Sequence, residues 1–201
     1  MASRVERDFL GEVTLPAGAL FGVHSARASV NFPLAVAPVP VRLLKAFALV
    51  KKACAIANAE LGYLPADVGR AIAAACDELA SEAPAAQFPV DALQGGAGTS
   101  TNMNVNEVLA NMALRRLGRE PGDYACVHLL DSVNRHQSTN DTYPTAPEIG
   151  YDAATALAGR LRSSGRTDVR AFLEEAVGSE VVGRRLAPEA IMSLGYVERQ
   201  K

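Results

Sequence analysis

A glycine-rich turn runs directly into a helical pattern at residues 94–117, and this junction constrains the fold more than any other part of the chain. Three glycines fall within residues 95–98, where they permit backbone conformations that other residues avoid. Apolar side chains then recur at the spacing of one helical face; they are Val105, Val108, Leu109, Met112 and Leu117. The pattern predicts a helix over residues 100–117, closed by Gly118.

The first turns of this predicted helix are unusually polar. Threonine and asparagine are poor helix formers because their side chains compete for backbone hydrogen bonds, yet the segment contains Thr101, Asn102, Asn104 and Asn106. An ordinary helix cap explains a lone glycine turn followed by serine or threonine. However, the unpaired N–H groups of a helix start also attract anions. The extra polar side chains favour this second interpretation, a carboxylate site.

Two further helices are predicted before the glycine turn. Residues 41–61 have a helical apolar period, with Lys51 and Lys52 on the opposite face. The apolar face there comprises Leu43, Leu44, Phe47, Val50, Cys54 and Ile56. Residues 65–82 follow, with Pro65 at a first-turn position. Their apolar face comprises Val68, Ile72, Cys76 and Leu79.

The remaining segments are less regular. Prolines and glycines break residues 1–40, where one short strand or hairpin is predicted near residues 9–15. The later predicted elements are, in order, a loop over 84–98, a connector over 123–139 with a short helical piece, a fourth helix over 140–162, and helical stretches over 168–177 and 188–194. The predicted fold class is mainly α, with a short irregular or β N-terminal segment and a short helical tail.

Composition argues against several classes of partner. The 201 residues carry a formal net charge of −2, which offers no field for nucleic acid or an anionic membrane. No apolar run reaches the roughly 18 residues of a membrane span, and the N-terminus lacks the apolar core of a signal peptide. A cytoplasmic location is therefore expected. Cys54, Cys76 and Cys126 are odd in number and widely spaced, which predicts free thiols.

A second polar cluster occupies residues 136–141. It brings hydroxyl, amide and carboxyl groups together just before Tyr143-Pro144-Thr145. Taken alone, Ser138, Thr139 or Asn140 would be interpreted as the cap of the helix that follows. The pairing of this cluster with the glycine turn and its polar helix makes the pattern specific.

Together the two clusters resemble the aspartase/fumarase superfamily of lyases. In that family, the motifs GGAGTS-x-NMN-x-NEVLAN and N-x-x-QSTND-x-YPT form two walls of a dicarboxylate site, and they match residues 95–111 and 134–145 here. The resemblance extends over about residues 4–150. The sequence QSTND at residues 137–141 is more similar to the aspartase branch, because fumarases usually carry a second serine at the position of Thr139.

The resemblance implies a helical N-terminal domain, a dicarboxylate substrate, and neither a cofactor nor a metal. It assigns carboxylate binding to Thr99, Ser138, Thr139 and Asn140. The implied reaction is a carbon–nitrogen lyase reaction that converts L-aspartate into fumarate and ammonia. Removing the β-proton builds negative charge on the neighbouring carboxylate, which preorganised donors would stabilise. The resemblance also implies a homo-oligomer, or association with a full-length or complementary chain.

The histidines carry weaker signals. Neither His24 nor His136 is expected to act as a base. His128 stands ten residues before Ser138, where fumarases place a His-Pro-Asn-Asp segment that forms a secondary dicarboxylate site. The corresponding segment here runs from His128 to Asp131 without the asparagine, so the resemblance gives His128 and Asp131 as a reduced version of that secondary anion site.

The expected organisation has three parts. A family-type N-terminal domain covers residues 1–139, a truncated first helix of a central bundle covers 140–162, and a helical tail covers 163–201. Residues 165–167 resemble either the start of the family's small C-terminal domain or a stub of a central Gly-Arg-Thr segment. The family's Gly-Ser-Ser-x-Met-Pro-x-Lys-x-Asn loop, whose serine is the proposed base, does not occur in the sequence.

Three functions remain open from the sequence. The first is an aspartase-type lyase that is inactive alone because the catalytic loop is missing. The second is a non-catalytic remnant or partial gene product that binds dicarboxylates or a full-length relative. The third is a fumarase-type hydratase, which shares the binding wall and differs in the leaving group.

Overall fold

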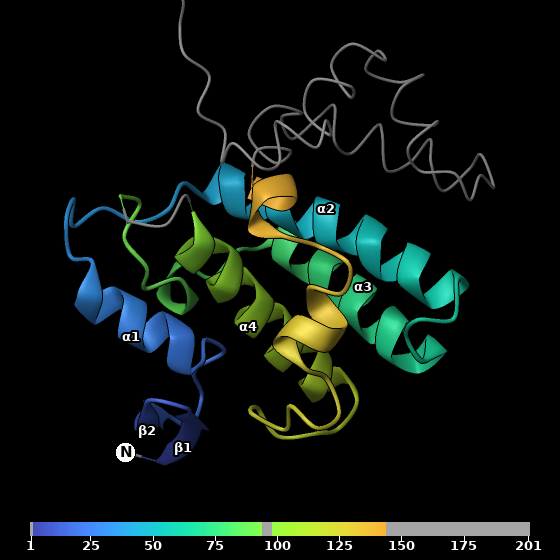
Figure 1. Cartoon of the computed structure of the whole chain (residues 1–201), viewed down its shortest axis with the longest axis horizontal. Coiled ribbons are helices and arrows are strands. Elements are labelled where there is room, and N and C mark those ends of the chain that lie inside the picture. The colour runs from blue at the N-terminus through green and yellow to red at the C-terminus, as the bar shows by residue number, and fades with distance from the viewer. Residues whose placement is uncertain (1, 94–97, 144–201) are drawn as a thin grey trace, which may run out of the picture. The chain divides into compact units, whose positions relative to one another are not determined.

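The computed structural model describes residues 2–93 and 98–143 (Figure 1). These residues form a two-stranded hairpin followed by packed helices, so the predicted mainly α class with a β segment at the N-terminus is confirmed. None of the helices described is both long and apolar enough to cross a membrane.

The N-terminal region contains more regular structure than the sequence predicted. Strands β1 (Ser3–Asp8) and β2 (Gly11–Pro16) pair in antiparallel register. Helix α1 (Val23–Asn31) then lies within the part that was expected to be irregular, so that prediction was wrong. Few side chains of α1 are buried, and for this reason no apolar stripe marks the helix in the sequence.

Helices α2 (Val41–Glu60) and α3 (Ala66–Ser81) pack against each other and were both predicted, with ends that differ by a residue. The predicted apolar face of α3 is buried. Pro65 stands just before α3 rather than inside its first turn. Gly69 of α3 lies against Ala59 of α2, where an added Cβ would come within 2.5 Å of the alanine methyl group. The glycine therefore permits the close approach of the two helices.

The prediction of the inner face of α2 was wrong at Lys51. Its side chain was placed opposite the apolar face, but it is 0% exposed. The buried residues of α2 that share this face are Leu44, Phe47, Ala48, Lys51, Ala55 and Asn58. Lys52 behaves as expected and pairs with Asp77 at 2.5 Å near the surface. Because apolar residues occur on every side of α2, their positions alone do not define the inner face.

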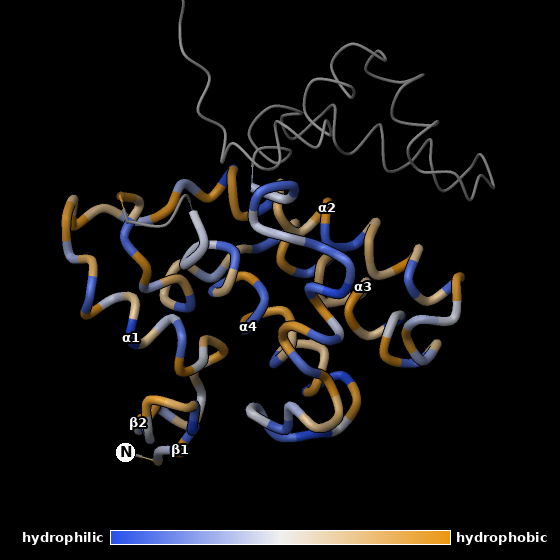
Figure 2. Tube along the Cα trace, in the orientation of Figure 1, coloured by the Kyte–Doolittle hydropathy of each residue, from blue (hydrophilic) through white to orange (hydrophobic). Residues whose placement is uncertain are grey.

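Helix α4 (Thr99–Arg116) packs against α1, α2, α3 and the short π-helix η2 (Leu129–Val133). Hydrophilic and hydrophobic residues alternate in its first turns (Figure 2), although most of the helix is buried. Gly98 precedes α4 with a φ of 81°, and Gly118 follows it with a φ of 70°. The predicted closure of this helix by Gly118 is thus confirmed.

The segments around α4 agree with the sequence in outline. η2 is the short helical piece predicted within the connector, and a single 3-10 turn, η1 (Ala85–Gln87), lies in the predicted loop before α4. Another helix begins at Thr139, close to the predicted start of the fourth helix. The predicted part of this helix beyond residue 143, the predicted tail helices and the predicted boundary at residue 163 lie outside the described residues.

Candidate functional site

The structure brings the two polar clusters into contact. Asn102 Nδ2 donates a hydrogen bond to Thr139 Oγ1 at 3.1 Å, and Thr142 Oγ1 donates to Asn102 Oδ1 at 3.4 Å. At the start of α4, the ring of Tyr143 lies so close to Gly98 that an added Cβ would overlap it. Two segments that are distant in the sequence therefore form adjoining walls.

Asn134 joins these walls to α2. Its Oδ1 accepts hydrogen bonds from Lys51 Nζ, Asn102 Nδ2 and Asn106 Nδ2 at 3.1, 3.3 and 3.2 Å. Its Nδ2 donates to the Gln137 carbonyl at 3.0 Å, and Lys51 Nζ also donates to Gln137 Oε1 at 3.1 Å. One hydrogen-bond network thus connects α2, α4 and the segment that follows η2.

Lys51 is the charged member of this network. Burial lowers the pKa of its ammonium group from 10.5 to about 8, and the nearby Cys54, Cys76 and Asp141 oppose that shift. Lys51 was not predicted from the sequence as a member of this network. Its spacing of seven residues from Leu44 and four from Ala55 was the signal that could have found it, because these positions share one helical face.

The lowered pKa of Lys51 predicts how stability depends on pH. Between about pH 8 and pH 10.5, the unfolded chain keeps the Lys51 proton while the folded chain releases it. The free energy of unfolding should therefore gain a contribution that rises with pH, by up to about 1.4 kcal/mol per pH unit. Urea unfolding at several pH values in this range should show the rise as a growing difference in unfolding free energy between the unsubstituted chain and Lys51→Met. The comparison is needed because the raised pKa values of Cys54 and Cys76 lower the stability of both chains as the pH rises. Lys52→Met should retain the rise, and a Lys51→Met profile identical to that of the unsubstituted chain would contradict the assignment.

Ser138 caps the helix that begins at Thr139. Its Oγ accepts a hydrogen bond from the Asn140 N–H at 3.0 Å, and its own N–H donates to the Asp141 carboxylate at 3.0 Å. This reciprocal arrangement is a variant of the capping box, in which the hydroxyl accepts from the second helical residue and the third, Asp141, accepts from the cap. The interpretation of Ser138 as an ordinary cap is therefore correct, but it is compatible with ligand binding. The hydroxyl oxygens of Ser138 and Thr139 each accept one hydrogen bond, which leaves their hydrogens to donate to a ligand.

The other two predicted binding residues also lie at these helix starts. Thr99 is the first residue of α4 and is exposed. Asn140 is the second residue of the helix that begins at Thr139 and is also exposed. The contacts of Gly98 with Tyr143 and of Asn102 with Thr139 place the two helix starts side by side. All four predicted binding residues thus belong to two adjoining helix starts.

His128 and Asp131 lie together at the start of η2. His128 Nδ1 is 3.1 Å from the Asp131 N–H and 3.2 Å from a carboxylate oxygen of the same residue. The hydrogen bonds described for this pair stay within residues 128–135. Because the imidazole already has a carboxylate neighbour, the secondary anion site stays a prediction. In residues 2–93 and 98–143, no group of three His, Cys, Asp or Glu side chains is placed to hold a metal ion.

His136 connects the second polar cluster to α2. It adopts a left-handed φ of 56°, and its Nδ1 lies 2.8 Å from Asn58 Oδ1. The imidazole also packs edge-on against the Tyr63 ring, with 4.6 Å between ring centroids. Asn58 Nδ2 in turn donates to the Arg135 carbonyl at 3.1 Å. These contacts give His136 a structural role in positioning the segment that leads to Ser138.

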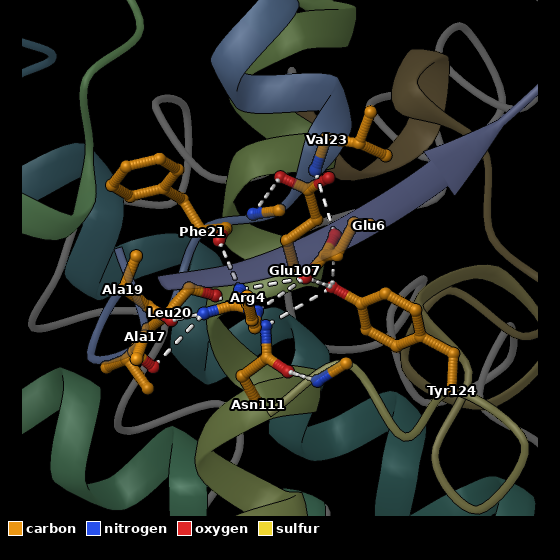
Figure 3. Close-up of polar contacts among 12 residues, drawn as sticks. Arg4, Glu6, Ala17, Ala19, Leu20, Phe21, Val23, Glu107, Asn111 and Tyr124 are labelled. Carbon is orange, nitrogen blue, oxygen red and sulfur yellow. Dashed lines mark hydrogen bonds and ion pairs between the residues drawn. The ribbon is translucent and has the colours of Figure 1, made fainter. Parts of the chain in front are cut away.

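A separate buried cluster holds α1 against α4 (Figure 3). Glu107 of α4 is 0% exposed and accepts hydrogen bonds from the N–H groups of Gly22, His24 and Ser25 at 2.8 to 3.2 Å. The Ser25 hydroxyl donates to it as well, at 2.5 Å. Burial raises the pKa of the Glu107 carboxyl, while these hydrogen bonds oppose the rise. The carboxyl thus supplies the cap that the sequence of α1 lacks.

The same cluster fixes the hairpin. Glu6 of β1 accepts a hydrogen bond from the Val23 N–H at 3.0 Å and pairs with Arg4 at 2.8 Å. Tyr124 Oη donates to Glu6 at 3.2 Å, so the connector after α4 also takes part (Figure 3). None of the four predicted binding residues belongs to this cluster. Its polar groups are accounted for by the positioning of β1 and α1.

Comparison with known proteins identifies the family. A family model described as "Lyase" matches residues 11–178, which is most of the chain. The chain belongs to the aspartase/fumarase family of lyases. The chain is 48% identical over 151 residues to the aspartate ammonia-lyase of Pseudomonas aeruginosa, an alignment that covers 74% of this chain and 32% of the relative. It is 43% identical over 173 residues to that of a Bacillus species, which covers 86% of this chain and 36% of the relative.

Solved structures of the family share the fold. The fumarate lyase:delta crystallin of Brucella melitensis matches with a TM-score of 0.71 at 48% identity, over 78% of this chain and 36% of that chain. A class II fumarase from Schistosoma mansoni matches with a TM-score of 0.67 at 34% identity, over 72% and 31% of the two chains. This chain therefore spans about a third of the length of the relatives that it matches.

Proposed function

We propose that this chain supplies carboxylate-binding walls for an aspartate ammonia-lyase site, which converts L-aspartate into fumarate and ammonia. The observation that carries the proposal is the hydrogen bond from Asn102 to Thr139, which joins the two polar helix starts. The aspartate ammonia-lyases that match at 43% to 49% identity support the choice of substrate.

The four binding residues are proposed to hold the carboxylates of L-aspartate. Ser138 and Thr139 donate through hydroxyl hydrogens, because each hydroxyl oxygen already accepts a hydrogen bond. Thr99 adds a hydroxyl at the positive end of the α4 dipole, and Asn140 adds an amide. Loss of the β-proton creates further negative charge on the adjacent carboxylate. Fixed neutral donors stabilise this charge more than they stabilise the substrate, which lowers the barrier.

Proton abstraction requires a base that this sequence does not supply in the family's usual form. The Gly-Ser-Ser-x-Met-Pro-x-Lys-x-Asn loop does not occur. Ser193, the only serine that follows a methionine, lacks the motif's glycine before it and the motif's proline and lysine after it. The chain alone is therefore proposed to bind dicarboxylates with very slow turnover. Mixing it with a chain that carries the loop should produce fumarate from L-aspartate, detected by ultraviolet absorbance. Absence of fumarate from the mixture would reject the catalytic part of the proposal.

Thr139→Val tests the binding wall directly. Loss of one hydrogen bond to a charged ligand should weaken succinate binding by about tenfold to a hundredfold in isothermal titration calorimetry. Asn102 keeps its hydrogen bond to Asn134 in this variant, so the unfolding transition should change little. Thr14→Val, an exposed position of β2, is the matched control and should bind like the unsubstituted chain. Undiminished succinate affinity in Thr139→Val would remove Thr139 from the site.

A fumarase-type hydratase is the second candidate. The similarity to a class II fumarase in both sequence and fold favours it, and the proposed binding wall would serve malate as well as aspartate. Turnover of L-aspartate and L-malate by the complemented protein separates the two candidates. Faster turnover of malate would replace the lyase proposal with the hydratase.

A further inference from the structure

Lys51 combines complete burial with an ionisable group. Its side chain is 0% exposed, and its Nζ donates to two neutral amide oxygens, Asn134 Oδ1 and Gln137 Oε1, both at 3.1 Å. None of the ion pairs among the described residues includes Lys51. Burying an ammonium group without a carboxylate partner costs free energy. Its presence here calls for a role beyond packing.

Both acceptors of the Lys51 ammonium belong to the segment that presents the proposed carboxylate donors. Gln137 directly precedes the two hydroxyl residues, and Asn134 holds its carbonyl at 3.0 Å. Asn134 also accepts from Asn102, which donates to Thr139. Three successive links of 3.1, 3.3 and 3.1 Å place Thr139 Oγ1 within about 10 Å of Lys51 Nζ.

Building on the proposed function, we infer that Lys51 is a positioning residue of the dicarboxylate site. Its ammonium group holds Asn134 and Gln137 in place and thereby sets the hydroxyl groups of Ser138 and Thr139 against α4. Its positive charge attracts the bound dianion from the protein interior. Because Lys51 is fully buried, it does both without touching the ligand.

The groups that face Lys51 leave most of its charge uncompensated. The thiols of Cys54 on α2 and Cys76 on α3 have pKa values raised by burial, to about 11 for Cys54, and are neutral near pH 8. Asp141 is the carboxyl group that interacts electrostatically with the ammonium, at a distance beyond an ion pair. Helix α4 contributes the neutral amides of Asn102 and Asn106 to the same network.

Deprotonation of Lys51 should therefore weaken the binding of a dianion. Lys51 Nζ lies within about 10 Å of Thr139 Oγ1. At a separation on the order of 10 Å and an effective dielectric constant of about 20, a unit charge changes the affinity for a dianion by about tenfold or more. Succinate stays fully ionised across the relevant pH range, so the titration of the ligand does not interfere. Affinity should fall through pH 8, whereas the Lys51 contribution to stability rises there. The fall in succinate affinity and the rise in the stability contribution both result from deprotonation of Lys51.

The test is calorimetric titration of the full chain with succinate from about pH 6.5 to about pH 9.5. The unsubstituted chain and Lys52→Met should each lose about tenfold in affinity through pH 8. Lys51→Met should bind about tenfold or more weakly near pH 7 and show no further loss. Lys51→Arg should restore binding and remain flat with pH, because arginine keeps its charge.

The outcomes separate the inference from the proposed function. A Lys51→Met variant with unchanged affinity and pH profile would overturn the inference. If Lys51→Met does not fold, Lys51→Arg decides, because an affinity that still falls through pH 8 would overturn it. If the unsubstituted chain binds no succinate, the proposed function fails instead. The inference is then decided by amide NMR signals of Ser138 and Thr139, which Lys51→Met must shift and Lys51→Arg must restore; unshifted signals would overturn it.

Discussion

Glu107→Ala should lower the free energy of unfolding by about 3–5 kcal/mol. The carboxyl group of Glu107 accepts the hydrogen bonds that cap α1, from the N–H groups of Gly22, His24 and Ser25. Alanine would leave these donors in the interior without their acceptor and would open a cavity in α4's contact with α1. Urea unfolding followed by circular dichroism measures the loss.

Glu78→Ala is the matched control for this prediction. It removes the same kind of side chain from a surface ion pair with Arg116. The side chain of Glu78 is 53% exposed and that of Arg116 is 41% exposed. A loss below about 1 kcal/mol is expected there. Glu107→Gln should recover part of the stability, because it keeps one acceptor oxygen and sets an NH2 group against the remaining donors. Equal losses in Glu107→Ala and Glu78→Ala would show that Glu107 does not cap α1.

Gly98→Ala should lower the free energy of unfolding by about 2–5 kcal/mol. The φ of 81° is unfavourable for alanine by about 1–2 kcal/mol. In addition, the new methyl group would overlap the ring of Tyr143, and overpacking of this kind costs about 1–3 kcal/mol. Tyr143 packs edge-on against Phe47, with 5.7 Å between ring centroids, so its ring cannot move without disturbing α2. Thermal or urea unfolding of the variant measures the sum.

Gly118→Ala separates the two contributions at Gly98. Gly118 has a similar φ of 70°, but an added Cβ there would meet no atom within 4 Å. Only the backbone cost of about 1–2 kcal/mol should remain. If Gly98→Ala proved no more damaging than Gly118→Ala, the contact between Gly98 and Tyr143 would be disproved.

Features that depend on neighbouring residues in the sequence were predicted correctly, whereas features that depend on distant residues were not. Helices α3 and α4 were predicted well because their apolar periodicity and the glycine after α4 are local signals. α1 was missed because it has no apolar stripe and its cap comes from Glu107 on α4. Lys51 was assigned to the wrong face of α2 because a lysine is ordinarily solvated. Its burial depends on acceptors that lie more than 80 residues later.

In the candidate site, too, local features could be predicted from the sequence and long-range contacts could not. Each polar cluster could be predicted as a helix start from its own residues, and Ser138 does cap its helix. The proximity of the two clusters could be inferred only through the family resemblance, because no local pattern places Asn102 beside Thr139. Asn134 belongs to the second motif, but no role was predicted for it from the sequence. Its importance arises from three donors that converge on one oxygen from two helices.

The cap of α1 also has a consequence for the order of folding during synthesis. Glu107 follows the start of α1 by more than 80 residues, and α1 has only nine residues, too few to be stable alone in water. A ribosome would release α1 and the hairpin long before α4 is complete. The hairpin and α1, although made before α4, would then acquire their final structure only after the helix that carries their acceptor has emerged.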